Sequence, residues 1–310
     1  MKKLSVIVPC YNESLVVEET YNRLTSIFSL EPYEYELIFL DNRSEDNTLK
    51  ILKKIAHEDK KVKVIGMSRN FGHQGSVACG INNCTGDVAA VIDADLQDPP
   101  ELIPEMLQLM EKQGANVIYG VRKSRKGEGW FKKITAKLFY RALNRMSDTQ
   151  FPVDVGDFRV MDRKVIDTFN GLKEKNKYVR GLISWMGFKQ IPFHYERAER
   201  FAGETKYPLK DLLRFAAVGI FYFSKKPLKI ATLTGFLAVI AGIVYAMVVL
   251  ISKLFLKDVM VSGWTSIIIL IVFFGGVQLL TIGVLGQYIG NLFDEAKDRP
   301  EYIIDEKINF

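Results

Sequence analysis

The stretch that decides the fold reads Val91-Ile92-Asp93-Ala94-Asp95-Leu96-Gln97-Asp98-Pro99-Pro100. Residues 88–92 form a short apolar run with β-branched members, which predicts a buried strand. Asp93 and Asp95 follow at once, and the paired prolines have the fixed φ that suits the start of a helix. At the end of a strand, both carboxylates can reach one divalent cation, because Mg²⁺ prefers oxygen ligands and keeps positions open for phosphate. A solvated loop that ends in a helix cap has the same pattern, so the assignment depends on the rest of the chain.

Apolar strand-like runs alternate with helix-like segments on both sides of this stretch. The predicted strands are residues 4–9, 35–40, 62–67 and 88–92, and the predicted helices are residues 15–28, 49–56 and 75–82. This alternation predicts an α/β fold with a mostly parallel sheet wrapped by helices. Such sheets bind ligands at the carboxyl ends of their strands. Tyr11, Glu13, Asp41 and Asp93 all fall at that edge, so the first half of the chain predicts a single ligand site.

The last third of the 310-residue chain has a different composition. Two runs, residues 230–252 and 259–293, contain no charged residue. Each exceeds the roughly 20 residues that a helix needs to cross a bilayer. A buried core helix is the alternative, but charge-free runs of this length are rare in soluble domains. We therefore expect a two-helix transmembrane hairpin over residues 230–293, with Lys253, Lys257 and Asp258 in the connection and a tail of residues 294–310.

Basic residues set the expected orientation of this hairpin. Residues 197–229 contain eight Lys or Arg against three Asp or Glu, whereas the connection contains two lysines. The positive-inside rule therefore predicts a multi-pass protein of the cell membrane, with the N-terminal part and the tail in the cytoplasm. The formal net charge of +6 fits anionic lipid or phosphate partners and requires no nucleic acid.

Several segments resemble those of a known family. Residues 5–13 (Ser5-Val6-Ile7-Val8-Pro9-Cys10-Tyr11-Asn12-Glu13), 41–46 and 93–95 are similar to the signatures of family 2 glycosyltransferases with the GT-A fold. Residues 69–74, 93–100 and 200–207 narrow the resemblance to polyprenyl-phosphate glycosyltransferases, a group that includes bactoprenol glucosyltransferases and dolichol-phosphate mannose synthases. There are two departures, Thr205 where the group has serine and Asn42 where the family often has a second aspartate. The second departure leaves Asp41 as the main acid of its segment.

The resemblance implies a domain organisation and a reaction. A GT-A (Rossmann-like) catalytic domain of residues 1–207 would be joined through a juxtamembrane amphipathic helix, residues 208–229, to the two transmembrane helices. The enzyme would transfer one sugar, with inversion and with a metal ion, from a nucleotide sugar to polyprenyl (undecaprenyl) phosphate at the cytoplasmic face. The product would be a lipid-linked sugar for cell-envelope glycosylation. Glucose from UDP-glucose is the first choice, with UDP-N-acetylglucosamine and GDP-mannose as alternatives.

The resemblance also implies residue roles. The expected nucleotide-sugar contacts are Pro9, Tyr11, Glu13, Asp41, Arg69, Asp93, Ala94 and Asp95. Asp93 and Asp95 would bring Mg²⁺ or Mn²⁺ to the diphosphate. Arg200 and Lys206 would bind the acceptor phosphate, for which charged forks and ammonium groups are suited, although both also fit an ordinary surface.

Asp157 and Asp95 complete the expected catalytic set with Arg200 and Lys206. Asp157 would act as a base or as an orienting group, and a turn acid before the strand at residues 158–161 has nearly equal weight. For His73, a contact on the nucleotide side is preferred over a role as metal ligand.

The remaining patterns leave alternatives open. Residues 130–146 place Lys133, Lys137, Arg141 and Arg145 along one side and apolar residues along the other, as in an interfacial helix or any surface helix of a basic protein. Glycines in the second apolar run allow close helix approach and therefore a homo-oligomer. A processive polysaccharide synthase is disfavoured because the Q-x-x-R-W segment is missing. An inactive membrane anchor is disfavoured by the intact acids Asp93 and Asp95.

Overall fold

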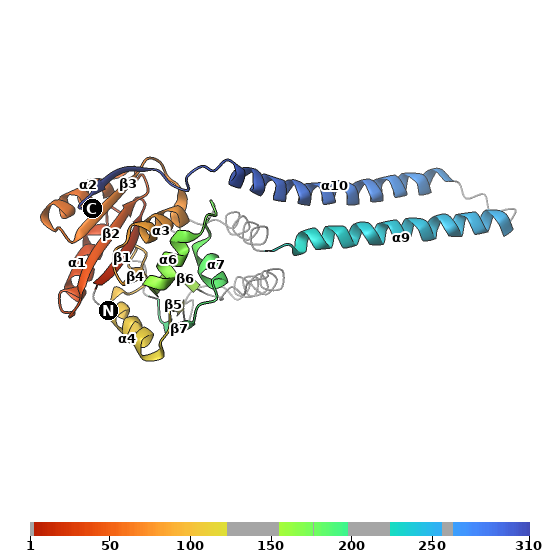
Figure 1. Cartoon of the computed structure of the whole chain (residues 1–310). Helices are drawn as coiled ribbons and strands as arrows, with labels where there is room; N and C mark the ends of the chain where they lie inside the picture. Colours follow the sequence, from red (N-terminus) through yellow and green to blue (C-terminus); the bar gives the residue numbers. More distant parts are fainter. Residues whose placement is uncertain (1–2, 123–154, 176, 198–223, 256–262) are drawn as a thin grey trace. The chain divides into compact units, whose positions relative to one another are not determined.

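The computed structural model describes residues 3–122, 155–175, 177–197, 224–255 and 263–310. Within these ranges the chain forms two units. One unit holds residues 3–122, 155–197 and 298–310, and the other holds the two long C-terminal helices (Figure 1). The predicted interfacial segment 130–146, the acceptor residues Arg200 and Lys206, and most of the predicted juxtamembrane helix lie outside the described residues.

One eight-stranded sheet forms the centre of the first unit, in the order β7-β5-β6-β4-β1-β2-β3-β8. Its strands are β1 (Lys3–Cys10), β2 (Glu34–Asp41), β3 (Val62–Met67), β4 (Val88–Val91), β5 (Val117–Arg122), β6 (Val155–Asp162), β7 (Gln190–Tyr195) and β8 (Ile304–Ile308). β1 to β4 run parallel to one another, and β5 is parallel to β7. β6 is antiparallel to β4 and β5, and β8 is antiparallel to β3. The prediction of a mostly parallel α/β sheet is confirmed, as are its four predicted strands.

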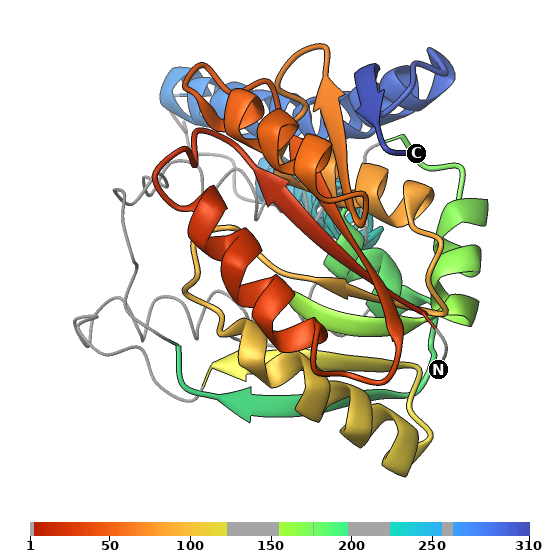
Figure 2. The ribbon, with the colours of Figure 1, turned by 90° about the vertical axis from the view of Figure 1, so that its left-hand side faces the viewer.

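Helices cover both faces of this sheet (Figure 2). α1 (Val17–Phe28), α2 (Thr48–Glu58) and α4 (Ile103–Gln113) pack on one face and share one apolar core with the strands. The opposite face is covered by α3 (Gly72–Asn83), α6 (Arg163–Gly171) and α7 (Val179–Trp185). Gly80 lets α3 approach the sheet closely, because a Cβ at this position would lie 2.3 Å from Cγ2 of Ile7. Pro99 caps the short 3₁₀ turn η1 (Pro100–Leu102), which begins at Pro100 and leads into α4, so the predicted helix start is confirmed.

Strand direction brings the predicted site residues to one edge of the sheet. The carboxyl ends of the parallel strands β1 to β4 lie at the same edge. Because β6 runs the opposite way, its amino end reaches this edge, and the carboxyl ends of β5 and β7 return to it. We call this edge the rim. It carries Asp41, Asp93, Asp157, Arg122 and Tyr195 from five different strands or the turns beside them.

The second unit consists of α9 (Lys226–Phe255) and α10 (Gly263–Ala296). Both contain candidate membrane spans by length and composition, Lys226–Ile251 and Ile267–Ala296, in which almost no residue is buried. The two apolar C-terminal helices are therefore confirmed. α9 begins four residues before the predicted run and continues past Lys253, so this lysine lies in the helix and not in the connection.

The tail after α10 forms an element that no sequence pattern indicated. Residues 304–308 make β8, which pairs with the edge strand β3. The Ser68 N–H donates to the Ile303 carbonyl at 3.0 Å. The Asn309 amide donates to the carbonyls of Ala56 and Val62 at 2.6 and 2.8 Å. The end of the chain is thus an integral part of the sheet.

Candidate active site

A hollow of about 610 Å³ opens on the rim beside β1, β2 and β3. Three predicted nucleotide contacts, Tyr11, Asp41 and Arg69, line it together. Asp41 is 1% exposed, and its Oδ2 accepts a hydrogen bond from the Ser44 N–H. Its Oδ1 is buried without a hydrogen-bond partner among the described residues, and burial raises the pKa of this carboxyl. A buried acceptor without a donor is suited to a ligand hydroxyl, such as that of a ribose.

Two further predicted contacts, Pro9 in β1 and Glu13 in the loop after it, have structural roles. Pro9 is buried in β1, in register with Leu40. The Glu13 N–H donates to Thr48 Oγ1 at 2.8 Å, and the Glu13 carbonyl accepts from the Val16 and Val17 N–H groups at the start of α1. Glu13 therefore fixes the loop that carries Tyr11.

Asn42 holds the loop after β3 through two hydrogen bonds, one donated and one accepted. Its Nδ2 donates to Asn70 Oδ1 at 2.9 Å, and its Oδ1 accepts from the Phe71 N–H at 2.9 Å. The position noted as a departure from the family pattern thus locks the loop that carries Arg69. An ionised aspartate could make the second bond but not the first.

The loop after β4 presents the two acids of the deciding stretch. Leu96 has a φ of 56°, a left-handed conformation that is unfavourable for a branched side chain and is typical of functional loops. It turns the chain so that the Gln97 N–H donates to Asp95 Oδ1 at 3.1 Å. Thr20 Oγ1, on α1, lies 2.9 Å from the buried carbonyl of Ala94 and ties this loop to the helix layer.

The donor set of this loop fits a hard divalent cation. Asp93 Oδ1 is buried with no hydrogen-bond partner in the described part of the chain. Burial, together with the charges of Asp157, Asp98 and Asp95, raises the pKa of Asp93 to about 6, against the opposing effect of His73. No group of three or more His, Cys, Asp or Glu side chains that could hold a metal comes together among the described residues. Asp93 and Asp95 alone would leave a divalent cation open positions for phosphate and water oxygens.

His73 connects the two acidic segments of the rim. Its Nε2 lies 3.0 Å from Asp157 Oδ2 and 3.6 Å from Asp93 Oδ1. Burial alone would lower the pKa of His73, but Asp93 and Asp157 raise it to about 9. The imidazole thus lies close to both Asp93 and Asp157, and the predicted contact on the nucleotide side stays a prediction.

Asp157 is surrounded by cationic groups. Its Oδ1 lies 3.2 Å from Arg180 Nε and 3.7 Å from Arg159 Nη2, and Gln74 Nε2 donates to its Oδ2 at 3.3 Å. Burial would raise the pKa of Asp157, but Arg180, His73 and Arg159 lower it well below its usual range. A carboxylate held ionised in this way is a weak base and a strong orienting group. The sequence could have indicated Arg159, because Asp157 and Arg159 are alternate residues of one strand and therefore lie on the same face of the sheet. No sequence pattern indicated Arg180.

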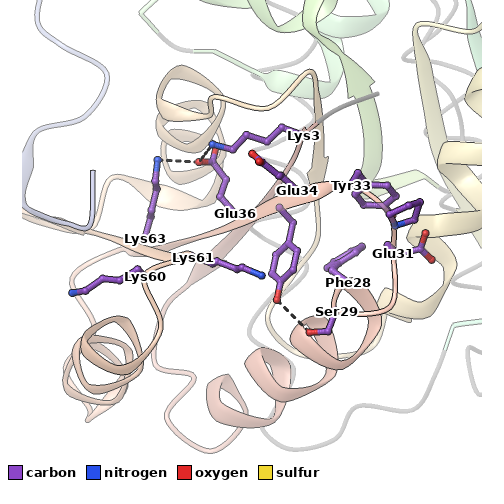
Figure 3. Close-up of a pocket in the computed structure, with 12 residues that line it drawn as sticks. Lys3, Phe28, Ser29, Glu31, Tyr33, Glu34, Glu36, Lys60, Lys61 and Lys63 are labelled. Carbon is purple, nitrogen blue, oxygen red and sulfur yellow. Dashed lines mark hydrogen bonds and ion pairs between the residues drawn. The ribbon is translucent and has the colours of Figure 1, made fainter.

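A second hollow, of about 620 Å³, lies at the amino ends of β1, β2 and β3, away from the rim (Figure 3). Glu36 at its edge is 2% exposed and forms ion pairs with Lys3 and Lys63 at 3.1 and 2.9 Å. Its carboxylate also accepts from Ser5 Oγ and from the Thr85 N–H. These bonds hold the amino ends of β1, β2 and β3 together, and they provide the Glu36 carboxylate with hydrogen-bond donors.

Comparisons with known proteins identify the family of this chain. Residues 5–169 match the model of glycosyl transferase family 2. YkcC of Bacillus subtilis, described as an uncharacterized glycosyltransferase, is 51% identical over 97% of this chain and 93% of its own length. The bactoprenol glucosyl transferase of Shigella phage SfV is 36% identical over 97% of this chain and 98% of its own. The solved structure of S. aureus TarS 1-349 in complex with UDP aligns with 72% of this chain and 66% of that chain. The sequence identity is 18% and the TM-score is 0.46, and both values are too low to transfer any residue role. The chain therefore belongs to glycosyl transferase family 2, and it is a glycosyltransferase.

Proposed function

We propose that this enzyme transfers one glucose from UDP-glucose to a polyprenyl phosphate at the cytoplasmic face of the cell membrane. The observation that carries the proposal is the order of groups along the rim, read together with the relatives described as bactoprenol glucosyl transferases. A nucleoside-sized hollow lies over β1 to β3, the acids Asp93 and Asp95 follow β4, and Asp157 with its cations lies on β6. A nucleotide sugar laid along this edge meets each group in turn.

The donor would be held by residues on the nucleotide side of the rim. Tyr11, Asp41 and Arg69 would contact the base and ribose, with Pro9 and Glu13 shaping the loop beneath them. Asp93 and Asp95 would hold Mg²⁺ or Mn²⁺ against the diphosphate, with Ala94 between them. When bound, such an ion supplies positive charge that stabilises the departing diphosphate.

The reaction needs no general base on this chain. An oxygen of the acceptor phosphate attacks the anomeric carbon while the bond from that carbon to the diphosphate breaks. UDP leaves, and the configuration at the anomeric carbon is inverted. A phosphate monoester is already mostly ionised near neutral pH, because its second pKa is about 6. The lowered pKa of Asp157 therefore supports an orienting role for this carboxylate. Arg200 and Lys206 would compensate the acceptor charge by charge-assisted hydrogen bonds.

A panel of nucleotide sugars tests the proposal. Membranes that contain the full chain are incubated with labelled UDP-glucose, UDP-N-acetylglucosamine or GDP-mannose and undecaprenyl phosphate, and the lipid is extracted. We expect one glucose on the lipid and much less product from the other donors. A preference for another nucleotide sugar would replace glucose as the proposed donor sugar. A polymer would indicate a processive synthase, and the absence of product from every donor would contradict the proposal.

The metal is tested in the same assay. EDTA should abolish transfer, and Mg²⁺ or Mn²⁺ should restore it. Asp95→Asn should lower turnover by about 10-fold or more at unchanged melting temperature, since one lost charge-assisted contact is worth roughly 1.5–3 kcal/mol. Full transfer in the presence of EDTA would remove the metal from the proposal.

A further inference from the structure

A buried ionic cluster lies on the rim beside the candidate active site and has no part in the proposed chemistry. Asp98, the last acid of the deciding stretch, accepts a hydrogen bond from Tyr195 Oη at 2.5 Å. Arg122 Nη2 lies 3.5 Å from Asp98 Oδ2, and Arg197 Nε lies 3.4 Å from Asp98 Oδ1. Arg122 Nε also donates to Tyr195 Oη at 3.4 Å. The Asp98 carboxylate thus joins the loop after β4 to the carboxyl ends of β5 and β7.

Burial and charge distinguish the carboxylate from its partners. Asp98 is fully buried, whereas the side chains of Arg122 and Arg197 are 18% and 28% exposed. Burial and the nearby Asp98 raise the pKa of Tyr195 well above its ordinary value, so this phenol stays neutral. Two guanidinium groups therefore share one carboxylate, and the cluster has an excess of one positive charge at a partly exposed surface. Such an excess suits an anionic ligand.

The order of strands places this excess charge on the side of the rim away from the nucleoside hollow. The hollow lies beside β1 to β3, whereas β5 and β7 lie beyond β4 and β6. A Cβ at Gly156 would lie 2.7 Å from Arg122 Nη2, so this guanidinium packs against the residue that precedes Asp157. A donor with its nucleoside in the hollow and its diphosphate at Asp93 and Asp95 would point its sugar toward this side, where the acceptor phosphate must approach.

We infer that Asp98 is a positioning residue for acceptor recognition, which rests on the function proposed above. It does not touch substrate. It holds Arg122 and Arg197 in fixed orientations, with Tyr195 as a neutral spacer, so that their exposed sides present positive charge to the phosphate monoester of the lipid. Satisfying Asp98 alone does not explain the two cations, because Asp98 Oδ2 has no hydrogen-bond partner among the described residues although Arg122 Nη2 lies 3.5 Å from it.

The test separates the acceptor from the donor in the full-length enzyme. Asp98→Asn keeps the shape of the side chain and removes its charge, and Tyr195→Phe removes one hydrogen bond. We expect Asp98→Asn to raise the KM for undecaprenyl phosphate, or to lower kcat, by about 10-fold, because the loss corresponds to a charge-assisted contact. Tyr195→Phe should act in the same direction by a smaller factor. The KM for the nucleotide sugar should stay within about twofold in both variants.

Glu36→Gln is the matched control. It makes the same change at a buried, ion-paired carboxylate at the opposite edge of the sheet. It should lower the melting temperature without changing either KM. An effect of Asp98→Asn on both substrates alike, or on melting temperature alone, would assign Asp98 a structural role and overturn the inference. If Asp98→Asn does not fold, an unchanged acceptor KM in Tyr195→Phe would overturn it. Absence of transfer by the wild-type enzyme would instead contradict the proposed function, and the inference with it.

Discussion

The side chain of Asn42 shows how one amide can hold a loop of the rim. Its amide donates to Asn70 and accepts from the Phe71 N–H, and the residue is 4% exposed. An aspartate at this position would place a second carboxylate beside the buried Asp41 and would face the Asn70 carbonyl oxygen with no proton to donate. The departure from the family pattern therefore changes how the loop that carries Arg69 is held.

Asn42→Asp should weaken donor binding. A lost hydrogen bond that leaves a buried group unsatisfied costs roughly 1–3 kcal/mol. If the loss distorts the hollow, it corresponds to about 5- to 150-fold in affinity. Calorimetric titration with UDP-glucose measures the effect. Asn116→Asp is the control, because Asn116 also donates to Asp162 and accepts from the Lys189 N–H but lies at the amino end of β5. Equal losses of affinity in both variants would contradict the role of Asn42.

Glu36 makes stability depend on pH. Burial would raise the pKa of this carboxyl, but hydrogen bonds from Ser5 and Thr85 and ion pairs with Lys63 and Lys3 lower it to about 2 from the ordinary value of 4.5. A carboxyl with a lowered pKa stabilises the fold fully above pH 4.5, and this contribution is lost as the pH falls toward 2. The pKa change corresponds to a contribution on the order of 3 kcal/mol.

Glu36→Gln should therefore melt at a lower temperature than the wild type at pH 7, and the gap should narrow below pH 4.5. Circular dichroism melts of the detergent-solubilised protein at pH 7, 5 and 3.5 measure this gap. A gap of constant size across these conditions would show that the lost packing of the side chain, and not its charge, destabilises the variant.

At the level of single residues, the sequence predicted those acids that end a strand within a recognisable motif. Asp41 and Asp93 are examples, because strand ends gather at one edge in a parallel sheet. Asp98 lies in the same motif, yet its role depends on Arg122 and Tyr195, which are distant in sequence. Arg180 meets Asp157 through α7, a short helix with no motif. Contacts between such segments follow from tertiary packing and cannot be predicted from local patterns.

Secondary-structure elements were predictable where apolar periodicity was strong. The strand at residues 62–67 has the predicted bounds. β1 and β2 are one residue longer than predicted at each end, and β4 is one residue shorter at its carboxyl end. β8 is different, because residues 304–308 place Asp305, Glu306 and Lys307 between two isoleucines. These charged residues are depleted in strands, so local propensity gives no strand signal here. Pairing with an edge strand that is already formed supplies the stability that the sequence lacks.

The tail strand protects the edge of the sheet. An unpaired β3 would expose a row of N–H and C=O groups that can pair with another chain. A truncation that removes residues 298–310 should lower stability by about 2 kcal/mol or more, since several hydrogen bonds worth roughly 0.5–1.5 kcal/mol each are lost, and it should promote aggregation. Thermal melts and size-exclusion chromatography in detergent measure both effects.

Asp305→Ala is the control for this truncation. It removes an ion pair with Arg43 at 3.7 Å in which both side chains are more than half exposed. Exposed pairs contribute roughly 0–1 kcal/mol, so this variant should behave as the wild type does. If the truncated protein also melts at the wild-type temperature and stays monodisperse, β8 does not stabilise the sheet.

For the whole molecule, chain connectivity adds a second argument to the count of basic residues. The sheet contains strands from before α9 and also β8 from after α10. Both ends of the helical pair therefore lead to the same folded unit. If α9 and α10 span a membrane, the chain must cross and return, which is the hairpin expected from the sequence. The excess of Lys and Arg in residues 197–229 then indicates the cytoplasmic side.

Cysteine labelling in intact cells tests this topology. The native cysteines Cys10, Cys79 and Cys84 are all buried, so background labelling by a membrane-impermeant maleimide should be low. A cysteine introduced at position 257 should react from outside, whereas Glu45→Cys and Asp305→Cys, at exposed positions of the sheet unit, should react after the cells are opened. Because β8 hydrogen-bonds to β3, the last two variants must agree with each other whatever the orientation. Labelling of both from outside, with position 257 protected, would reverse the orientation and exclude the use of a cytosolic nucleotide sugar. Labelling of Asp305→Cys alone from outside would break the link between the tail strand and the catalytic sheet.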